Sequence, residues 1–269
     1  MKQTCILIVG MHRSGTSALT GTLNILDAYV GENQMTPGKQ NPKGFFENKN
    51  VLEFNKKVFQ KHYGDWDFPI YSNSKISSEI DIINLEKLLK NEYKYEKFIA
   101  IKDPRLAYLF PLYSNVLSNM GVDVKVIIPF RNPLEVAESL TERNGFSQEK
   151  GMLLWAYYFL ISEKLTRNFP RVFTQFDELI KTPQKVIKQI DQKLKLNLNS
   201  KYNYKKDEIN KFLEPNLKHH NIPFNSFSDK IPKIICDIVN LKSKLNKPGL
   251  DIKFDELRLQ LFENQRLLF

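Results

Sequence analysis

The chain has 269 residues, of which 42% are apolar and 26% are charged, and its formal net charge is +10. These proportions are typical of a folded globular protein, and they exclude wholesale disorder and a collagen-like chain. Two cysteines, Cys5 and Cys236, are too few for a disulfide framework. We interpret them as reduced thiols, and because no targeting segment is visible we expect a cytoplasmic protein. The longest apolar run, 152–161, is about half of the roughly 20 residues that a membrane span needs, so no membrane partner is expected.

The elements of the first half are predicted in the following order. An apolar run over 4–9 predicts a strand, and leucines at helical spacing predict a helix from Thr16. Glycines and prolines mark a loop over 31–44. Helices are then expected over 48–63 and, capped by Ser78, over 79–92. A second short strand over 97–101 and a helix over 106–120 follow.

The second half continues the alternation as far as residue 195. The run over 122–130 is the strongest strand pattern, and Pro133 opens a helix through Leu140. An aromatic-rich helix over 148–168 follows, in which Trp155, Tyr157, Tyr158 and Phe159 are interpreted as core packing. A strand over 171–176 and a helix over 183–194, capped by Thr182 and Pro183, complete the pattern.

Strands that alternate with helices in this way indicate the α/β class. We predict a P-loop-like, open parallel sheet of four to five strands with helices on both faces. Beyond residue 196 the rhythm is lost, and two helices are expected, over 230–246 and 254–267. The whole chain, 1–269, is therefore interpreted as a single domain, with an α/β core over 1–195 and a helical C-terminal extension over 196–269.

The first candidate site follows the first strand. Gly10, Gly15 and Ser17 have the spacing of the nucleotide-binding loop G-x-x-x-x-G-K-[ST], in a strand–turn–helix context that can hold an anion on free backbone N–H groups. Thr16, however, stands at the lysine position, which argues against ordinary ATP or GTP hydrolysis. The cation here is Arg13, whose guanidinium can bind phosphate or sulfate oxygens in a fork.

The second candidate site follows the third predicted strand. Arg131 stands where that strand ends, at the sheet edge where open α/β sheets bind ligands. Ser139 lies two turns into the next predicted helix, so the two side chains can converge on one anion. The alternative is an arginine paired with a surface glutamate and a serine that faces solvent.

Together the two sites resemble the sulfotransferases that use 3'-phosphoadenosine 5'-phosphosulfate (PAPS). Their first loop, [RK]-S-G-[ST]-[ST], corresponds to the stretch Arg13, Ser14, Gly15, Thr16 and Ser17 and binds the 5'-phosphosulfate. Their second element, an arginine with a serine about eight residues later, corresponds to Arg131 and Ser139 and binds the 3'-phosphate.

Three further stretches resemble the bacterial carbohydrate-type members. They are Lys102-Asp103-Pro104-Arg105, the segment 41–47 (NPKGFFE), and 173–183 (FTQFDELIKTP), with Phe176 and Asp177 where tyrosine and glutamate are usual. The resemblance covers residues 4–195. For the basic C-terminal loop of some members, the candidate here is 218–220 (KHH).

The resemblance implies a sulfotransferase that moves a sulfuryl group from PAPS to a hydroxyl of a carbohydrate or other small metabolite, releasing 3'-phosphoadenosine 5'-phosphate (PAP). Arg13 would stabilise the leaving group. No metal is required by this scheme. The general base is expected among Glu47, His12 and Asp103, and Lys102 and Arg105 could bind the transferred sulfate or an acidic acceptor. The alternatives are a glutamate that only favours a helix start, a histidine that donates a hydrogen bond, and an aspartate that holds Arg105 or caps a turn. Arg143 is a further candidate contact near the 3'-phosphate, and Trp66 could stack on adenine.

Two other function classes stay open. One is a P-loop nucleotide kinase or other phosphotransferase, which the threonine at position 16 disfavours. The other is a non-catalytic nucleotide-binding module. A nucleic-acid binder is less favoured, because the lysines are scattered and no zinc-ligand spacing or RNA-binding strand signature occurs. A phosphate-bearing small ligand accounts equally well for the positive charge.

Overall fold

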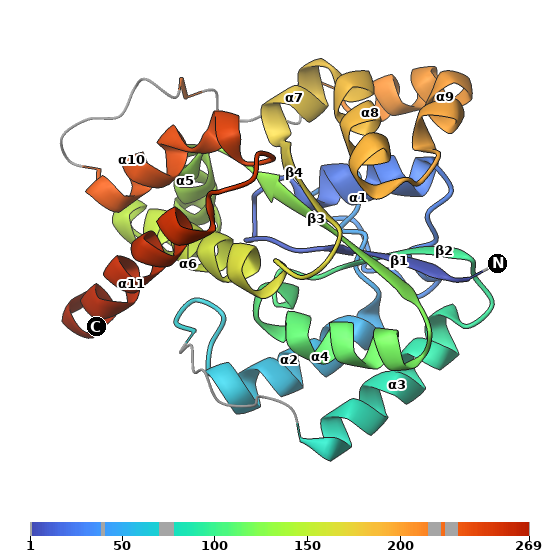
Figure 1. Cartoon of the computed structure of the whole chain (residues 1–269), viewed down its shortest axis with the longest axis horizontal. Helices are drawn as coiled ribbons and strands as arrows, with labels where there is room; N and C mark the ends of the chain where they lie inside the picture. Colours follow the sequence, from blue (N-terminus) through green and yellow to red (C-terminus); the bar gives the residue numbers. More distant parts are fainter. Residues whose placement is uncertain (1, 39–40, 70–77, 215–221, 224–230, 269) are drawn as a thin grey trace.

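In a computed structural model, four parallel strands form one sheet at the centre of the molecule (Figure 1). The structure describes residues 2–38, 41–69, 78–214, 222–223 and 231–268. The strands are β1 (Thr4–Ile8), β2 (Phe98–Lys102), β3 (Asp123–Phe130) and β4 (Arg171–Gln175). They lie in the order β2-β1-β3-β4. Because all pairs are parallel, the carboxyl ends of the strands meet at one edge of the sheet.

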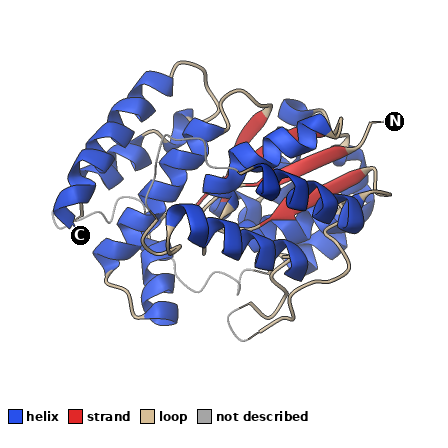
Figure 2. Ribbon diagram, turned by 90° about the horizontal axis from the view of Figure 1, so that it is seen from below, coloured by secondary structure: helices blue, strands red, loops and turns tan. Residues whose placement is uncertain are grey.

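Helices cover both faces of the sheet, as the sequence predicts (Figures 1 and 2). One face is covered by α2 (Lys49–Tyr63), α3 (Glu79–Tyr93), α4 (Leu106–Asn119), α5 (Pro133–Asn144), α6 (Gln148–Leu165), α10 (Lys233–Asn240) and α11 (Asp251–Leu268). The other face is covered by α1 (Thr16–Ile25), α7 (Phe176–Lys181), α8 (Pro183–Leu194) and α9 (Leu198–Phe212). The α/β prediction is therefore confirmed.

The period-two alternation of a strand distributes each apolar run between two cores. In β1, Cys5 and Leu7 are buried against α2–α6, whereas Ile6 and Ile8 are buried against α1 and α8. A run that is apolar at every position is what a sheet covered on both faces requires. The aromatic residues of α6 are also buried, so their interpretation as core packing is confirmed. Cys5 and Cys236 are both free thiols.

The first residues of several helices are set by the residues that cap them. Ser78 forms a complete capping box with Asp81, and Asn132 accepts a hydrogen bond from the Leu134 N–H just before Pro133. Thr182 is the N-cap residue of α8 and Pro183 is its first residue, as predicted, but the Thr182 side chain makes no capping hydrogen bond. Its hydroxyl donates instead to the Glu178 carbonyl, 3.1 Å away, because α7 fills the gap between β4 and α8.

The C-terminal region differs most from the expectation. A third helix, α9, precedes α10 and was not predicted, because its sequence is mostly polar and its buried side consists of few residues, including Leu198, Tyr202 and Ile209. The helix α10 is shorter than the predicted 230–246, since a 3-10 turn over Lys242–Lys244 follows it. No helix of the described residues is long and apolar enough to cross a membrane.

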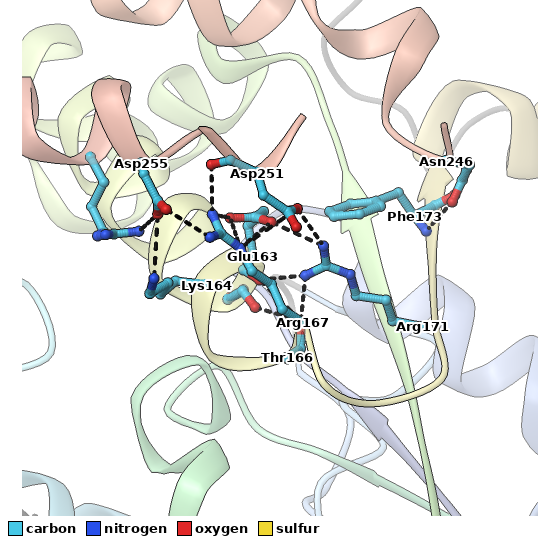
Figure 3. Close-up of polar contacts among 11 residues, drawn as sticks. Glu163, Lys164, Thr166, Arg167, Arg171, Phe173, Asn246, Asp251 and Asp255 are labelled. Carbon is cyan, nitrogen blue, oxygen red and sulfur yellow. Dashed lines mark hydrogen bonds and ion pairs between the residues drawn. The ribbon is translucent and has the colours of Figure 1, made fainter. Parts of the chain in front are cut away.

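An ion-pair network attaches α11 to α6 and β4 (Figure 3). Glu163, which is completely buried, accepts hydrogen bonds from Arg167 at 2.6 Å and from Arg171 at 3.0 Å. Arg167 continues to Asp255 of α11, 2.9 Å away. Next to the network, the Asn246 side chain bonds both the N–H and the carbonyl of Phe173 in the edge strand β4. The region beyond residue 196 is thus packed against the core on both faces.

Candidate functional site

The loop between β1 and α1 requires glycine at position 15. Gly15 has φ +85°, and a Cβ atom there would lie 2.3 Å from Cδ2 of Phe176. Arg13, with φ 66°, is also left-handed, so the loop turns sharply before α1 begins at Thr16. The first-turn N–H groups of a helix lack intrahelical partners and can bind an anion here. The Ser14 hydroxyl is buried without a hydrogen-bond partner among the described residues.

The two predicted anion sites meet directly. The Arg13 Nε donates a hydrogen bond of 2.6 Å to the Ser139 hydroxyl, and an Arg131 N–H donates one of 2.9 Å to the Arg13 carbonyl. These contacts join residues more than a hundred positions apart, at the carboxyl ends of neighbouring strands β1 and β3. Both motifs therefore belong to one site.

Arg131 is itself held by three contacts. It forms an ion pair with Glu135 at 3.0 Å, contacts the Arg13 carbonyl, and lies 4.5 Å above the centre of the Phe176 ring. The alternative reading is therefore half right: Arg131 does pair with a glutamate. That glutamate is fully buried, however, and Ser139 is 3% exposed and bonded to Arg13 rather than to solvent.

An open pocket of about 820 Å³, including solvent at its mouth, lies over this edge of the sheet. The described lining residues include five cations and one carboxylate. They are Arg13, Lys43, Lys102, Arg131 and Arg143, with Glu47. An excess of positive charge at the carboxyl ends of parallel strands indicates an anionic ligand.

Glu47 and Lys102 form an ion pair in the wall of the pocket. Their oxygen and nitrogen are 2.5 Å apart, and the Lys102 side chain is almost entirely buried. Burial raises the pKa of Glu47, while Lys102 acts in the opposite direction. Glu47 lies just before Asn48, the N-cap of α2, so it does stand at a helix start. Its side chain nevertheless accepts a hydrogen bond from Lys102 at the end of β2, a contact that a glutamate serving only the helix start would not need.

Asp103 has the contacts of a structural residue. It accepts hydrogen bonds from the backbone N–H and the guanidinium of Arg105 and from the Asn55 amide. Neither Asp103 nor Arg105 is among the lining residues, although both are buried immediately behind Lys102 and Pro104. These contacts favour a role in fixing the β2–α4 turn.

His12 borders the opposite wall. Its ring contacts Trp66 edge-on, with 4.6 Å between centroids, and its buried Nε2 has no hydrogen-bond partner among the described residues. Burial, and then the nearby cations Arg143, Arg105, Lys102 and Arg13, hold the pKa of His12 well below its usual value. His12 is therefore neutral at pH 7, and its Nε2 is available for a hydrogen bond.

Most of the predicted site residues are brought together. Those that line the pocket are His12, Arg13, Gly15, Thr16, Ser17, Glu47, Lys102 and Arg131. Those that lie behind the lining are Ser14, Ser139, Asp103 and Arg105. The stretch 218–220 lies outside the described residues.

Sequence reasoning missed several lining residues. Residues 41–46 form one wall, and the pattern NPKGFFE was the available signal, although it had singled out only Glu47. Phe176 and Phe212 also line the pocket. Phe212 contacts Phe46 edge-on from the end of α9, and no local pattern indicated this contact.

No family model and no curated protein matches the chain. The solved structures to which the chain is similar include three sulfotransferases. The sulfotransferase domain of the Synechococcus PCC 7002 olefin synthase is 16% identical, with 96% of this chain and 94% of that chain covered. The sulfotransferase STF9 from Mycobacterium avium is 12% identical (83% and 70% covered), and the sulfotransferase domain from the curacin biosynthetic pathway is 14% identical (97% and 98% covered). The TM-score is 0.40 in each case, a likeness too weak to assign a function.

Proposed function

We propose that the protein is a PAPS-dependent sulfotransferase that acts on a hydroxyl of a carbohydrate or another small metabolite. The observation that carries the proposal is the contact between the two motifs, in which Arg13 of the glycine loop donates to Ser139 and Arg131 donates to the Arg13 carbonyl. One anion-binding surface is thus built from both motifs. It has threonine rather than lysine at position 16, and the cation of the glycine loop is Arg13.

The residues of the pocket fit a ligand with two phosphate-type groups. The Ser14 hydroxyl is buried without a partner among the described residues, and the loop around Gly15 leaves no room for a Cβ atom. Arg13 and the N–H groups of residues 14–17 would hold the 5'-phosphosulfate. Arg131 and Ser139 would hold the 3'-phosphate.

PAPS, when bound, supplies the sulfuryl group, whose sulfur–oxygen bond to the 5'-phosphate breaks as the acceptor oxygen attacks. Arg13 would stabilise the charge on the departing phosphate. The acceptor proton would pass to Glu47 or to the neutral His12, both of which line the pocket. Lys102, paired with Glu47, would hold that carboxylate ionised and lie close to the transferred group.

The kinase alternative requires a cation at position 16, where this chain has threonine, and no observation favours it over the proposal. A nucleotide-binding module without activity would share the nucleotide-binding surface. It would bind PAP and would show no transfer of labelled sulfate from PAPS to any acceptor.

The decisive experiment compares PAP with adenosine 5'-phosphate, which lacks the 3'-phosphate, by calorimetric titration. We expect the wild-type protein to prefer PAP by at least a hundredfold and to bind ATP with magnesium weakly. Arg131→Ala and Arg131→Lys should reduce this preference to a few-fold, and Lys150→Gln, outside the pocket, should leave it unchanged. Because the preference is a ratio, general damage to the fold cancels. A wild-type protein without the preference would refute the proposal.

A further inference from the structure

Arg143 lines the pocket from α5, the helix that also carries Ser139. It is four residues after Ser139 on α5, which places it about 6 Å further along the helix axis and away from Arg131. Its guanidinium carbon is 5.3 Å from the centre of the Trp66 ring, and the same ring contacts His12. Arg143, His12 and Glu47 all line the pocket.

Among the described residues, no carboxylate forms an ion pair with Arg143. The pocket cations Lys43, Lys102 and Arg131 each form an ion pair with a glutamate. Within the described part of the chain, the contacts of Arg143 are the Asn144 side-chain oxygen, at 2.6 Å, and the Trp66 ring. Burial lowers the pKa of Arg143, and the Glu47 carboxylate, which lines the same pocket, acts in the opposite direction.

A guanidinium in this position is prepared to bind an anion. Its planar group lies against an aromatic face, which restricts its orientation and leaves its N–H groups directed elsewhere. A ligand anion would recover the solvation that burial removes. The two anionic ends of PAPS are already assigned to Arg13 and Arg131, so the charge at Arg143 is available to the second substrate.

We propose that the acceptor is itself an anion, and that Arg143 binds its carboxylate, sulfate or phosphate group while the hydroxyl to be sulfated faces Glu47 and His12. This inference rests on the proposed function and narrows its substrate class to hydroxylated acids. Trp66 is the positioning residue that holds Arg143 in place. Arg143 is thus assigned to the acceptor, whereas the sequence had suggested a contact near the 3'-phosphate.

The test uses inorganic phosphate as the probe, titrated into PAP-saturated protein at constant ionic strength. Tryptophan fluorescence reports the binding, because Arg143 contacts Trp66 and the other tryptophan, Trp155, is buried in the core. We expect a saturable signal that weakens at least tenfold in Arg143→Gln. Lys150→Gln is the matched control, since Lys150 also lies over a ring, that of Phe146, but outside the pocket. The affinity of the Lys150→Gln variant for phosphate should stay within twofold of the wild-type value. Equal affinity in Arg143→Gln, or no saturable signal in the wild type, would overturn the inference.

Titration with PAP separates this inference from the proposed function. Arg143→Gln should keep its PAP affinity within twofold. A loss as large as that of Arg131→Ala would place Arg143 in the nucleotide site and refute the inference alone. Failure of the wild type to bind PAP would refute the proposed function, and the inference with it. In acceptor screens with PAPS, hydroxy acids should react at least tenfold faster in kcat/KM than their matched amides, and equal rates would count against an anionic acceptor.

Discussion

Replacing Gly15 by alanine tests how the glycine loop is built. Two separate costs are expected. An alanine at φ +85° is in the left-handed region, which costs about 1–2 kcal/mol. Its Cβ would also lie 2.3 Å from the Phe176 ring, and forcing that ring aside should add about 1–3 kcal/mol, as overpacking does.

Gly145 supplies the control for this prediction. It has φ 72° and ψ 19°, and nothing lies within 4 Å of the position that a Cβ atom would occupy. Gly145→Ala therefore bears the backbone cost alone, and the reduced entropy of the unfolded chain is the same for both variants. Urea denaturation should show Gly15→Ala to be less stable than Gly145→Ala by about 1–3 kcal/mol.

The clash also predicts a functional loss. Phe176 packs below Arg131, so displacing the ring should weaken PAP binding at least tenfold in Gly15→Ala and leave it unaltered in Gly145→Ala. In a Phe176→Leu background, where the shorter side chain can rotate away, the cost of Gly15→Ala should fall by about 1 kcal/mol. Equal stability losses at the two glycines, or an unchanged cost in that background, would refute the steric argument.

Two further predictions concern buried charge. Glu163→Gln should destabilise the protein by about 3 kcal/mol in urea denaturation, because two arginines lose a fully buried partner. The control Lys185→Gln, at an exposed ion pair, should cost less than about 0.5 kcal/mol. A similar small loss of stability at both sites would contradict this prediction. Since the pKa of His12 is lowered in the folded state, the unfolded chain takes up a proton below pH 6.5 that the folded chain does not, so the stability of the protein should fall as the pH drops from 7.5 to 5. His12→Gln should remove that part of the pH dependence, and parallel stability curves for wild type and variant would exclude it.

Local sequence patterns were sufficient to predict the strands and helices of the α/β core. The stretches 4–9 and 126–130 are apolar on both faces, and this pattern predicts strands covered by helices on both sides. Once the strands are parallel, residues that follow β1 and β3 must share one edge, so the sequence alone places Arg13 and Arg131 at a common site. The strand ends differ from the predictions by a single residue.

The apolar pattern predicted secondary structure less well in the C-terminal region, where a helix buries few side chains. The helix α9 has mostly polar residues and buries a narrow stripe, so its sequence resembles a loop. Phe212, at the end of that helix, enters the pocket because α9 packs against α1, and this packing depends on contacts between distant segments. For Asp103 the sequence offered both a general base and a residue that holds Arg105, and its bonds to Arg105 and Asn55 favour the second.

The amino-acid sequence by itself determined the fold class, the two anion-binding motifs and their shared edge of the sheet, because periodicity and glycine spacing are local properties of the chain. The tertiary structure alone decided which charges are compensated. Arg131 has Glu135, Lys102 has Glu47, and Arg143 has an aromatic ring and no ion pair with a described carboxylate. Ion pairing depends on a few ångströms between side chains of different elements, and that distance is set by how the helices pack on the sheet.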